Sequence, residues 1–391
     1  MPLIQEPSYV FLVLLTLLGA IFFLSSRKSL KKIFDIIPPI FLAYLVPTLL
    51  SNFGVIPAES AFYVWAKKYL LPMSLFLILI GIDIPAILRL GPKMLITMLS
   101  GTLGVILGGP IAVALFKNYL HPDSWMGLAA LAGSWIGGVS NFAAIAQGLQ
   151  APQQFVSPAI VIDTIVGFSW MALLMFFSTF QGKFDTWNRA DTSMILEVQK
   201  KLEGFHKQVL RPSTVTDILV ILTLGFTGGV LCFKLGHFVP YQSKVFSPTL
   251  WGVILTTMIA ALLSFTPLRK LEGAGSTRIS YAALYLLLTT MGAQADLRAV
   301  VQSPVYLAVG IVWLSIHIIF ILIALRLLRA PLFFGAVGSM ANIGGTVSCP
   351  IVAEVYREHM LPAGILMALV GTILGNYGGL LCGLLMKFVL S

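Results

Sequence analysis

One acidic residue, Asp163, stands inside a long apolar run of the chain. Its neighbours include Val161, Ile162, Ile165 and Val166, so the segment that carries it is expected to lie within a lipid bilayer. An aspartate at the centre of a spanning helix costs about 2.5–3.5 kcal/mol on insertion scales, and such residues face the protein interior. We therefore expect Asp163 to meet a cation, a proton or hydrogen-bond donors. A structural acid that caps a neighbouring helix is the alternative.

No lysine or arginine lies in the middle of an apolar run, where it could balance Asp163. A mobile cation is then a candidate partner, because carboxylate, hydroxyl, amide and carbonyl oxygens can hold a sodium ion. The side chains expected to supply these oxygens are those of Asp163, Thr164, Ser140, Asn141, Thr346 and Ser348. A proton on Asp163 alone satisfies the sequence equally well. Sodium and proton both stay open as the coupling ion, and no other cofactor is expected.

Two Gly-Gly pairs, Gly137-Gly138 and Gly344-Gly345, lie within apolar runs. They would let each helix unwind, which exposes backbone amides on one half and carbonyls on the other. The amino end of a helix favours a negative group, so a solute carboxylate could be held there, as could a neutral polar solute. The residues expected to bind this solute are Ser134, Trp135, Gly137, Gly138, Ser339, Asn342, Gly344 and Gly345.

Other polar residues near or within apolar runs have more ordinary expected roles. His317 stands alone in an apolar stretch, where a histidine more often bonds a backbone carbonyl than moves protons. Asp83 and Asp296 lie near the ends of apolar runs, beside Arg89 and Arg298 respectively. For these four residues we expect pairing at the membrane interface.

The composition of the 391 residues is that of a membrane protein. Hydrophobic residues make up 58% and charged residues only 10%, with a mean hydropathy of +0.94, against roughly 25% charged in ordinary globular chains. The net charge is +10, and the basic residues that produce it lie between apolar runs, where they orient the chain in the bilayer. We therefore expect a lipid bilayer as partner and no nucleic acid. The three cysteines lie in apolar stretches, without the spacing of a zinc site.

Twelve apolar ranges are long enough to be read as transmembrane helices, which need about 20 such residues. They lie near 9–25, 34–53, 68–88, 94–117, 126–147, 156–180, 216–233, 247–266, 280–297, 304–328, 332–353 and 362–389. The predicted fold is therefore all-α, with about twelve (11–13) transmembrane helices. A polar interval at 181–215 separates a first half, 1–180, from a second half, 216–391. Part of this linker has helix-like apolar spacing, which allows an amphipathic helix on the membrane surface or a solvated linker.

The two halves share a motif, which predicts an internal duplication. The range 126–147 contains GSWIGGVSNF at 133–142, and the range 332–353 contains GSMANIGGTVSCP at 338–350. The ranges that follow them also match, with Pro158 and Pro362 separated by 204 positions. Matched glycine-interrupted segments are typical of discontinuous helices at the binding site of secondary transporters. Close helix packing through small residues is the simpler reading of either segment alone.

The orientation of the halves conflicts with a simple count of crossings. Six crossings between the two motifs would make the halves parallel and would place Arg269, Lys270, Arg278, Arg326 and Arg329 outside, against the positive-inside tendency. One miscounted segment between about 181 and 266 would remove the conflict. We therefore predict inverted repeats with two crossed discontinuous helices.

Several functional classes lack their signatures in this chain. There is no HExxH, GxxxxGK[ST] or GxSxG motif and no Cys/His cluster, so nucleotide-driven pumps and the commoner membrane hydrolases are not indicated. Nothing suggests the filter or charge ring of a channel. We expect a protein that is not an enzyme.

The chain resembles the YjcL-like family of bacterial membrane proteins of unknown function over nearly its whole length. The resemblance is carried by GIDIPAILRLGPK at 81–93 and by the two glycine motifs. More remotely, the layout is similar to the superfamily of bile-acid sodium symporters and sodium/proton antiporters. That resemblance implies a bacterial inner (cytoplasmic) membrane location, a homodimer, and an elevator-like movement of a core that includes 126–180 and 332–389.

The acidic residues favour one coupling mode within that superfamily. Where those antiporters carry two acids, or Asn-Asp, this chain has Ile162-Asp163-Thr164. The single acid favours cation-coupled symport of a small organic solute over cation/proton antiport. A membrane scaffold or receptor that transports nothing is the alternative from another class.

Overall fold

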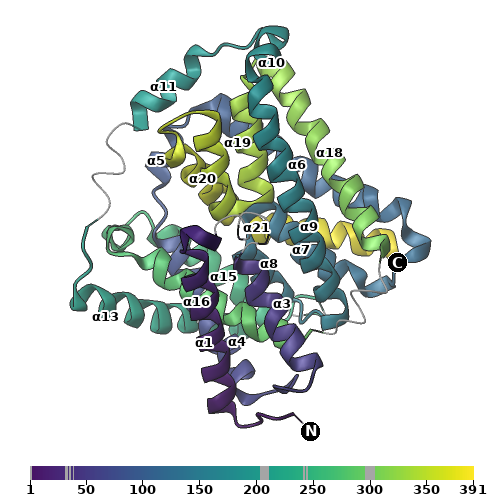
Figure 1. The fold of residues 1–391 in the computed structure, drawn as a ribbon, viewed down its shortest axis with the longest axis vertical. Coiled ribbons are helices and arrows are strands. Elements are labelled where there is room, and N and C mark those ends of the chain that lie inside the picture. The colour runs from purple at the N-terminus through teal and green to yellow at the C-terminus, as the bar shows by residue number, and fades with distance from the viewer. Residues whose placement is uncertain are drawn as a thin grey trace.

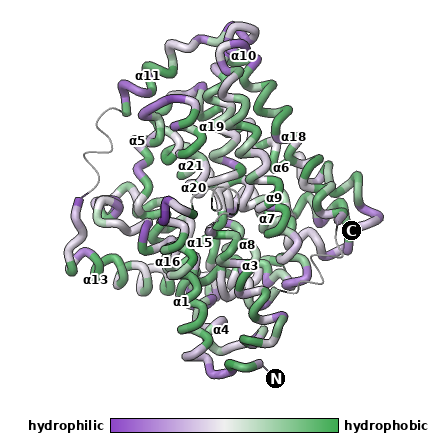
Figure 2. Tube along the Cα trace, viewed as in Figure 1, coloured by the Kyte–Doolittle hydropathy of each residue, from purple (hydrophilic) through white to green (hydrophobic). Residues whose placement is uncertain are grey.

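The computed structural model describes residues 2–30, 34, 37, 39–202, 211–240, 243, 245–295 and 304–391. All regular secondary structure in these residues is helical (Figure 1). Apolar residues run along the helices and polar residues gather in the connections, including those beside α10 and α13 (Figure 2). The expected all-α architecture is confirmed. Asp296 and Arg298 lie outside the described residues.

In the part of the chain that the structure describes, seven helical segments are long and apolar enough to cross a membrane, which is fewer than the twelve expected. They are α1 (Pro7–Ser25), α4 (Ala61–Ile80), α6 (Pro92–Leu115), α9 (Gln153–Phe177) continued by α10 (Gln181–Asn188), α13 (Val215–Thr223) continued by α14 (Gly229–Lys234) as far as Phe238, α18 (Pro304–Leu328) and α21 (Leu361–Leu390). An eighth is α15 (Pro248–Leu263) if it is joined to the 3-10 helix Pro267–Ala274, to which it is bent by 96°.

The remaining expected ranges are helical but shorter, more polar or interrupted. α3 (Pro39–Asn52) has 14 residues, and α16 (Ser276–Ala293) carries Arg278 and several hydroxyl side chains. Two ranges are divided in the middle, into α7 (Trp125–Gly137) with α8 (Val139–Gly148) and α19 (Leu332–Ile343) with α20 (Gly345–Tyr356). Two further short helices are α5 (Ile84–Leu88) and α11 (Ser193–Leu202).

Each divided range folds back on itself as a hairpin. In the first, a Cβ on Gly133 of α7 would lie 2.5 Å from the Cδ1 of Ile145 on α8. In the second, the Cys349 Sγ on α20 lies 3.3 Å from the Val337 carbonyl oxygen on α19. Residues twelve positions apart in a continuous helix would be separated by about 18 Å. The expectation that these ranges cross the membrane as discontinuous helices is therefore wrong.

The hairpins turn at glycines. Gly138, between α7 and α8, has φ 91° and ψ −178°, a region that is essentially restricted to glycine. Gly345, at the start of α20, has φ 57°. The two turns meet, because a Cβ on Gly345 would lie 3.0 Å from the Gly138 Cα. The arms have 13, 10, 12 and 12 residues, or about 15–20 Å, roughly half of the ~30 Å hydrocarbon core.

The helix ends gather in two opposite regions, and the hairpins open to different ones. At the first, named the basic end, the contacts are Asp83–Arg269, Leu332 N–Asp185, Asn188–Leu325 O, Asp191 N–Arg329 O and Tyr356–Leu174 O. At the opposite end they are Tyr306–Ser124, Lys387–Trp125, Ser247–Gly148 O and Asn52–Ala295 O. The α7–α8 hairpin thus begins and ends at the opposite end, and the α19–α20 hairpin at the basic end.

The helices pack as two groups. The hairpin group contains α6, α7, α8, α9, α18, α19, α20 and α21, in which α21 runs along α7 and α18 along α6. The flanking group contains α1, α3, α4, α13, α14, α15 and α16, in which α16 packs on α3 and α4. The flanking helices occupy the lower left of Figure 1, with α6, α18, α19 and α20 above them. At the boundary, α15 touches α8 and α21.

The first part of the polar linker is helical and packed. α11 buries Ile195, Val198 and Leu202 and contacts α21. The predicted amphipathic helix is therefore present in this segment, and its apolar face is covered by protein.

Candidate functional site

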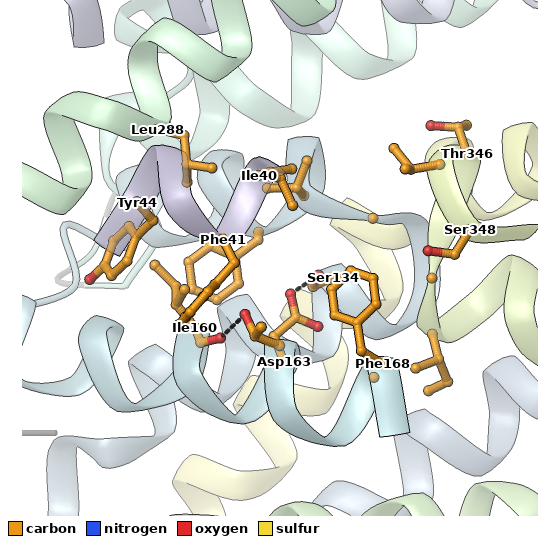
Figure 3. Close-up of a pocket in the computed structure, with 18 of the residues that line it drawn as sticks. Ile40, Phe41, Tyr44, Ser134, Ile160, Asp163, Phe168, Leu288, Thr346 and Ser348 are labelled. Atoms are coloured by element: carbon orange, nitrogen blue, oxygen red, sulfur yellow. Dashed lines mark hydrogen bonds between the residues drawn. The ribbon is translucent and has the colours of Figure 1, made fainter. Parts of the chain in front are cut away.

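A cavity of about 100 Å³ lies where the two hairpin turns face the flanking group (Figure 3). One water needs roughly 10–15 Å³ measured in this way, and sites for drug-sized ligands begin near 300 Å³. The space therefore suits an ion, a few waters or a small solute. Its walls come from α7, α8, α9, α19 and α20 on one side and from α3 and α16 on the other.

Asp163, on α9, lies in the wall of this cavity beside Ser134 (Figure 3) and accepts two hydrogen bonds. The Ser134 hydroxyl donates to Oδ2 at 2.7 Å, and the Trp135 indole N–H donates to Oδ1 at 3.0 Å. A carboxylate offers about four acceptor positions, so two remain beyond these bonds. Among the residues that the structure describes, no lysine or arginine lines the cavity. The two donors, both on α7, hold the carboxylate in a fixed orientation.

Further oxygen atoms come from Thr164, Thr346 and Ser348, which also line the cavity. The Thr164 hydroxyl donates to the Ile160 carbonyl oxygen at 2.9 Å, so its lone pairs stay available. The Thr346 hydroxyl is hydrogen-bonded to the hydroxyl of Tyr281, which comes from α16. This bond joins the second hairpin turn to the flanking group.

The first turns of α8 and α20 both line the cavity, through Val139 and through Thr346, Val347 and Ser348. The amino end of a helix carries partial positive charge and unpaired N–H groups, which suit an anion. An acid and two helix amino ends thus face one small space. Such a site can hold a cation at Asp163 and a carboxylate or another polar group beside it.

The apolar part of the lining was not anticipated from the sequence. Phe41 and Tyr44 on α3, Phe168 on α9 and Tyr281 on α16 contribute aromatic rings. Their only signal in the sequence is an aromatic residue inside an apolar run, which is common in membrane helices. Among the described residues, no three His, Cys, Asp or Glu side chains converge as a metal-ligand group.

Two of the expected solute-binding residues, Ser339 and Asn342, lie outside the cavity in a separate network. His317 Nδ1 is 2.9 Å from the Gly101 carbonyl oxygen, and Nε2 is 2.8 Å from Ser339 Oγ. Because a carbonyl can only accept, Nδ1 carries the proton, as expected for a histidine bonded to backbone. The Ser339 hydroxyl therefore donates to Nε2, and its oxygen accepts from the Trp170 indole at 2.8 Å. Asn342 donates to the Met98 and Gly338 carbonyl oxygens and accepts from Thr102 at 2.8 Å.

Most of the other expected site residues lie behind the lining of the cavity, and two glycines belong to the lining. Trp135 is fully buried and reaches Asp163 only through its indole N–H. Ser140 and Asn141 are buried on α8 and do not line the cavity. The Asn141 Nδ2 has no hydrogen-bond partner in the described part of the chain. Gly137 and Gly345 belong to the turns, whereas Gly138 and Gly344 line the cavity itself.

The expected interfacial acid Asp83 has a different partner from the one proposed. Its Oδ1 lies 3.5 Å from Arg269 and accepts the backbone N–H of Ala86 at 3.2 Å. It therefore caps α5 and joins two connections at the basic end, whereas the neighbouring Arg89 forms no ion pair with a described carboxylate.

These helices define a multi-pass membrane protein with a small cavity that contains one acid at the meeting point of two hairpins. The chain belongs to the DUF819 family, described as proteins of unknown function, whose family model matches residues 13–389. It is also a distant homologue of the uncharacterized membrane protein YjcL of Bacillus subtilis (strain 168). The two are 26% identical over 351 residues, which cover 85% of this chain and 86% of YjcL. The resemblance to YjcL-like proteins is confirmed, and neither description states a function.

Proposed function

We propose that this protein is a secondary active transporter that couples the uptake of a small organic solute to sodium or protons. The observation that carries the proposal is the cavity in which Asp163 and the first turns of α8 and α20 face the same space. Buried acids in membrane proteins mark ion pathways and proton relays. Transporter sites characteristically place helix ends at the substrate near the bilayer midplane.

The cation is assigned to Asp163. Both carboxylate oxygens accept from α7, and the described lining of the cavity offers no fixed positive charge. A sodium ion bound here would draw its other ligands from Thr164, Thr346 and Ser348, after local adjustment of the turns. A proton on Asp163 would serve the same purpose. In either case, charge neutralisation allows the acid to move through the low-dielectric interior.

The solute is small and carries a carboxylate or another hydrogen-bonding group. A cavity of about 100 Å³ excludes large ligands. The aromatic rings of Phe41, Tyr44 and Phe168 provide an apolar wall against the carbon skeleton. The amino ends of α8 and α20 provide donors for the polar group.

The two halves are proposed to be inverted repeats. Each half contains two helices, then a long helix, a hairpin and another long helix. In the first half these are α3, α4, α6, α7–α8 and α9, and in the second half they are α15, α16, α18, α19–α20 and α21. The hairpins open to opposite ends, as inversion requires. Because each hairpin enters and leaves on the same side of the membrane, one side then carries all of the following basic residues: Arg269, Lys270, Arg278, Arg326, Arg329 and Arg357. By the positive-inside rule, this basic end is cytoplasmic.

Alternating access is proposed to be elevator-like. The cavity lies between the hairpin group and the flanking group, so sliding one group past the other would expose it to each side in turn. The described polar bonds across this part of the boundary include Tyr281–Thr346 and Tyr44–Ser157. A few such bonds can be exchanged during the movement.

The test combines ion-dependent stability with transport. The melting temperature of purified protein is measured in sodium and in choline at equal ionic strength and several pH values, because a ligand that binds only the folded state raises stability. We expect a sodium-dependent or pH-dependent rise that Asp163→Asn abolishes. Asp123→Asn, the same change at an exposed acid outside the cavity, should retain it. A variant Asp163→Asn that keeps the full ion response would overturn the proposal.

Solute coupling is then tested in proteoliposomes with small carboxylic acids, amino acids and peptides. In a symporter, sodium and solute raise each other's affinity, because coupling is reciprocal. Competition between sodium and protons without any solute effect would instead indicate an antiporter. Full function of Asp163→Asn in cells, with no ion response in the wild type, would favour a scaffold.

A further inference from the structure

A second hollow, of about 520 Å³, lies at the basic end between α10 and the end of α20. Its lining includes Gln181, Thr186, Arg189, Thr192, Tyr356 and Arg357. It is separate from the Asp163 cavity, with which it shares no lining residue. In Figure 1, α10 lies at the top of the molecule, with α19 and α20 below it.

The hollow carries two positive charges without a matching acid. Neither Arg189 nor Arg357 forms an ion pair with a carboxylate of the residues that the structure describes. Asp185 also lines the hollow, but its Oδ1 accepts the backbone N–H of Leu332 at 2.7 Å and its Oδ2 accepts from Gln181 at 3.3 Å. That carboxylate is therefore engaged by α19 and by its own helix.

We propose that this hollow binds a phosphate group, which the guanidinium groups of Arg189 and Arg357 hold from two sides. Guanidinium groups bind phosphate through paired, charge-assisted hydrogen bonds. The Thr192 hydroxyl, which has no hydrogen bond to a described residue, adds a third donor. Arg189 also stands at φ 51°, where glycine or asparagine is usual. The backbone conformation at the end of α10 therefore does not explain why an arginine occupies this position.

The phosphate group can belong to a lipid headgroup or to a free phosphate. A lipid source fits the surroundings, because the helical segment that leads into Arg189 also exposes Phe177, Phe180 and Trp187, by 41%, 41% and 65%, and these side chains would contact acyl chains. Basic pockets between membrane helices on the cytoplasmic side bind anionic lipid headgroups. Free phosphate uses the same donors without these apolar contacts.

Phosphate binding would join α10 to the mouth of the α19–α20 hairpin. α10 is already attached to this region, since Asp185 caps α19 and the Asn188 amide donates to the carbonyl oxygens of Leu325 and Ala330 at 2.9 Å. Arg357 directly follows α20. A bridging anion would therefore hold both arms of the hairpin through one helix, whatever the hairpin's function is.

The experiment measures the melting temperature of the full-length protein in nanodiscs. In phosphatidylcholine discs, inorganic phosphate is titrated against chloride at equal ionic strength. In parallel, discs that contain phosphatidylglycerol are compared with pure phosphatidylcholine discs. A rise with inorganic phosphate identifies free phosphate as the ligand source, and a rise only with phosphatidylglycerol identifies a lipid headgroup. No rise in either arm overturns the proposal.

Variants locate the effect. Arg189→Gln and Arg357→Gln should each weaken phosphate binding about ten-fold or more, as expected for loss of a charge-assisted bond, and the double variant should lose the response. Arg→Lys changes at both sites keep the charges without the paired geometry and should restore only part of it. The control is Lys183→Gln, which removes a charge from α10 outside the hollow. A double Gln variant with an unchanged response, or a control with the same loss, overturns the proposal.

Discussion

Gly138 provides a direct test of the hairpin turn, because its backbone conformation disfavours any residue other than glycine while its surroundings leave space for a Cβ. Its φ of 91° and ψ of −178° lie in a region that costs a non-glycine residue about 1–3 kcal/mol. Space is not limiting, since a Cβ would find the Gly345 Cα at an ordinary 3.6 Å. The change Gly138→Ala should therefore lower the free energy of unfolding by about 1–3 kcal/mol, almost entirely through backbone strain.

Gly167 is the matched control. It also lines the cavity, but it lies inside α9, where a Cβ would meet only the Ile343 Cγ2 at 3.7 Å. Alanine is preferred to glycine in a helix interior by about 0.8–1.0 kcal/mol. Gly167→Ala should therefore leave the free energy of unfolding unchanged or raise it, opposite in sign to Gly138→Ala.

The assay is a reversible denaturant titration of the detergent-purified protein, with transport of the identified solute measured on the same preparations. The difference between the two alanine variants should be about 1–4 kcal/mol. If Gly138→Ala is as stable as Gly167→Ala, the turn does not depend on glycine and the described hairpin geometry is refuted. Equal slopes of the titration curves are required, since a changed slope would mean a changed unfolded or native state.

Two further predictions concern the surroundings of the hairpins. Asp185→Ala removes the acceptor for the Leu332 N–H and should lower the free energy of unfolding by about 0.5–2 kcal/mol. Asp185→Asn keeps an acceptor oxygen and should retain most of that stability. Equal losses for the two variants in the denaturant titration would contradict the capping role. His317→Ala removes the acceptor of the Ser339 hydroxyl and one of the donors to the Gly101 carbonyl and should cost about 1–3 kcal/mol in total. The sodium response should survive this change, and its loss would place His317 in the ion site.

The chemistry-bearing residues were in part predictable from the sequence. An acid without a nearby basic residue in an apolar run needs hydrogen-bond or charge partners in the protein interior, so the sequence predicts a functional or structural role for Asp163. In the structure its partners are Ser134 and Trp135. The Gly-Gly pairs correctly marked where helices are interrupted, because only glycine adopts the backbone conformation found at Gly138. The proposed ion and solute themselves stay predictions.

The sequence could not predict in the same way which residues line the cavity. Ser339 and Asn342 lie in the same motif as the cavity residue Gly344, yet they face a neighbouring helix and not the open space. Which side of a buried helix meets a cavity depends on what packs against it. Hydropathy is no guide when all sides are apolar, and the lining residues Phe41 and Tyr281 carried no motif at all.

The sequence by itself determined that the chain is helical, that it lies in a membrane, where its helices are interrupted and which acid is buried, because these properties follow from local composition and backbone chemistry. Only the tertiary structure decided that the ranges 126–147 and 332–353 fold back as hairpins. A run of about 20 apolar residues is equally compatible with crossing and with turning back. The choice depends on contacts between the two arms, such as Gly133 with Ile145, and between the two turns at Gly138 and Gly345, which no local pattern specifies.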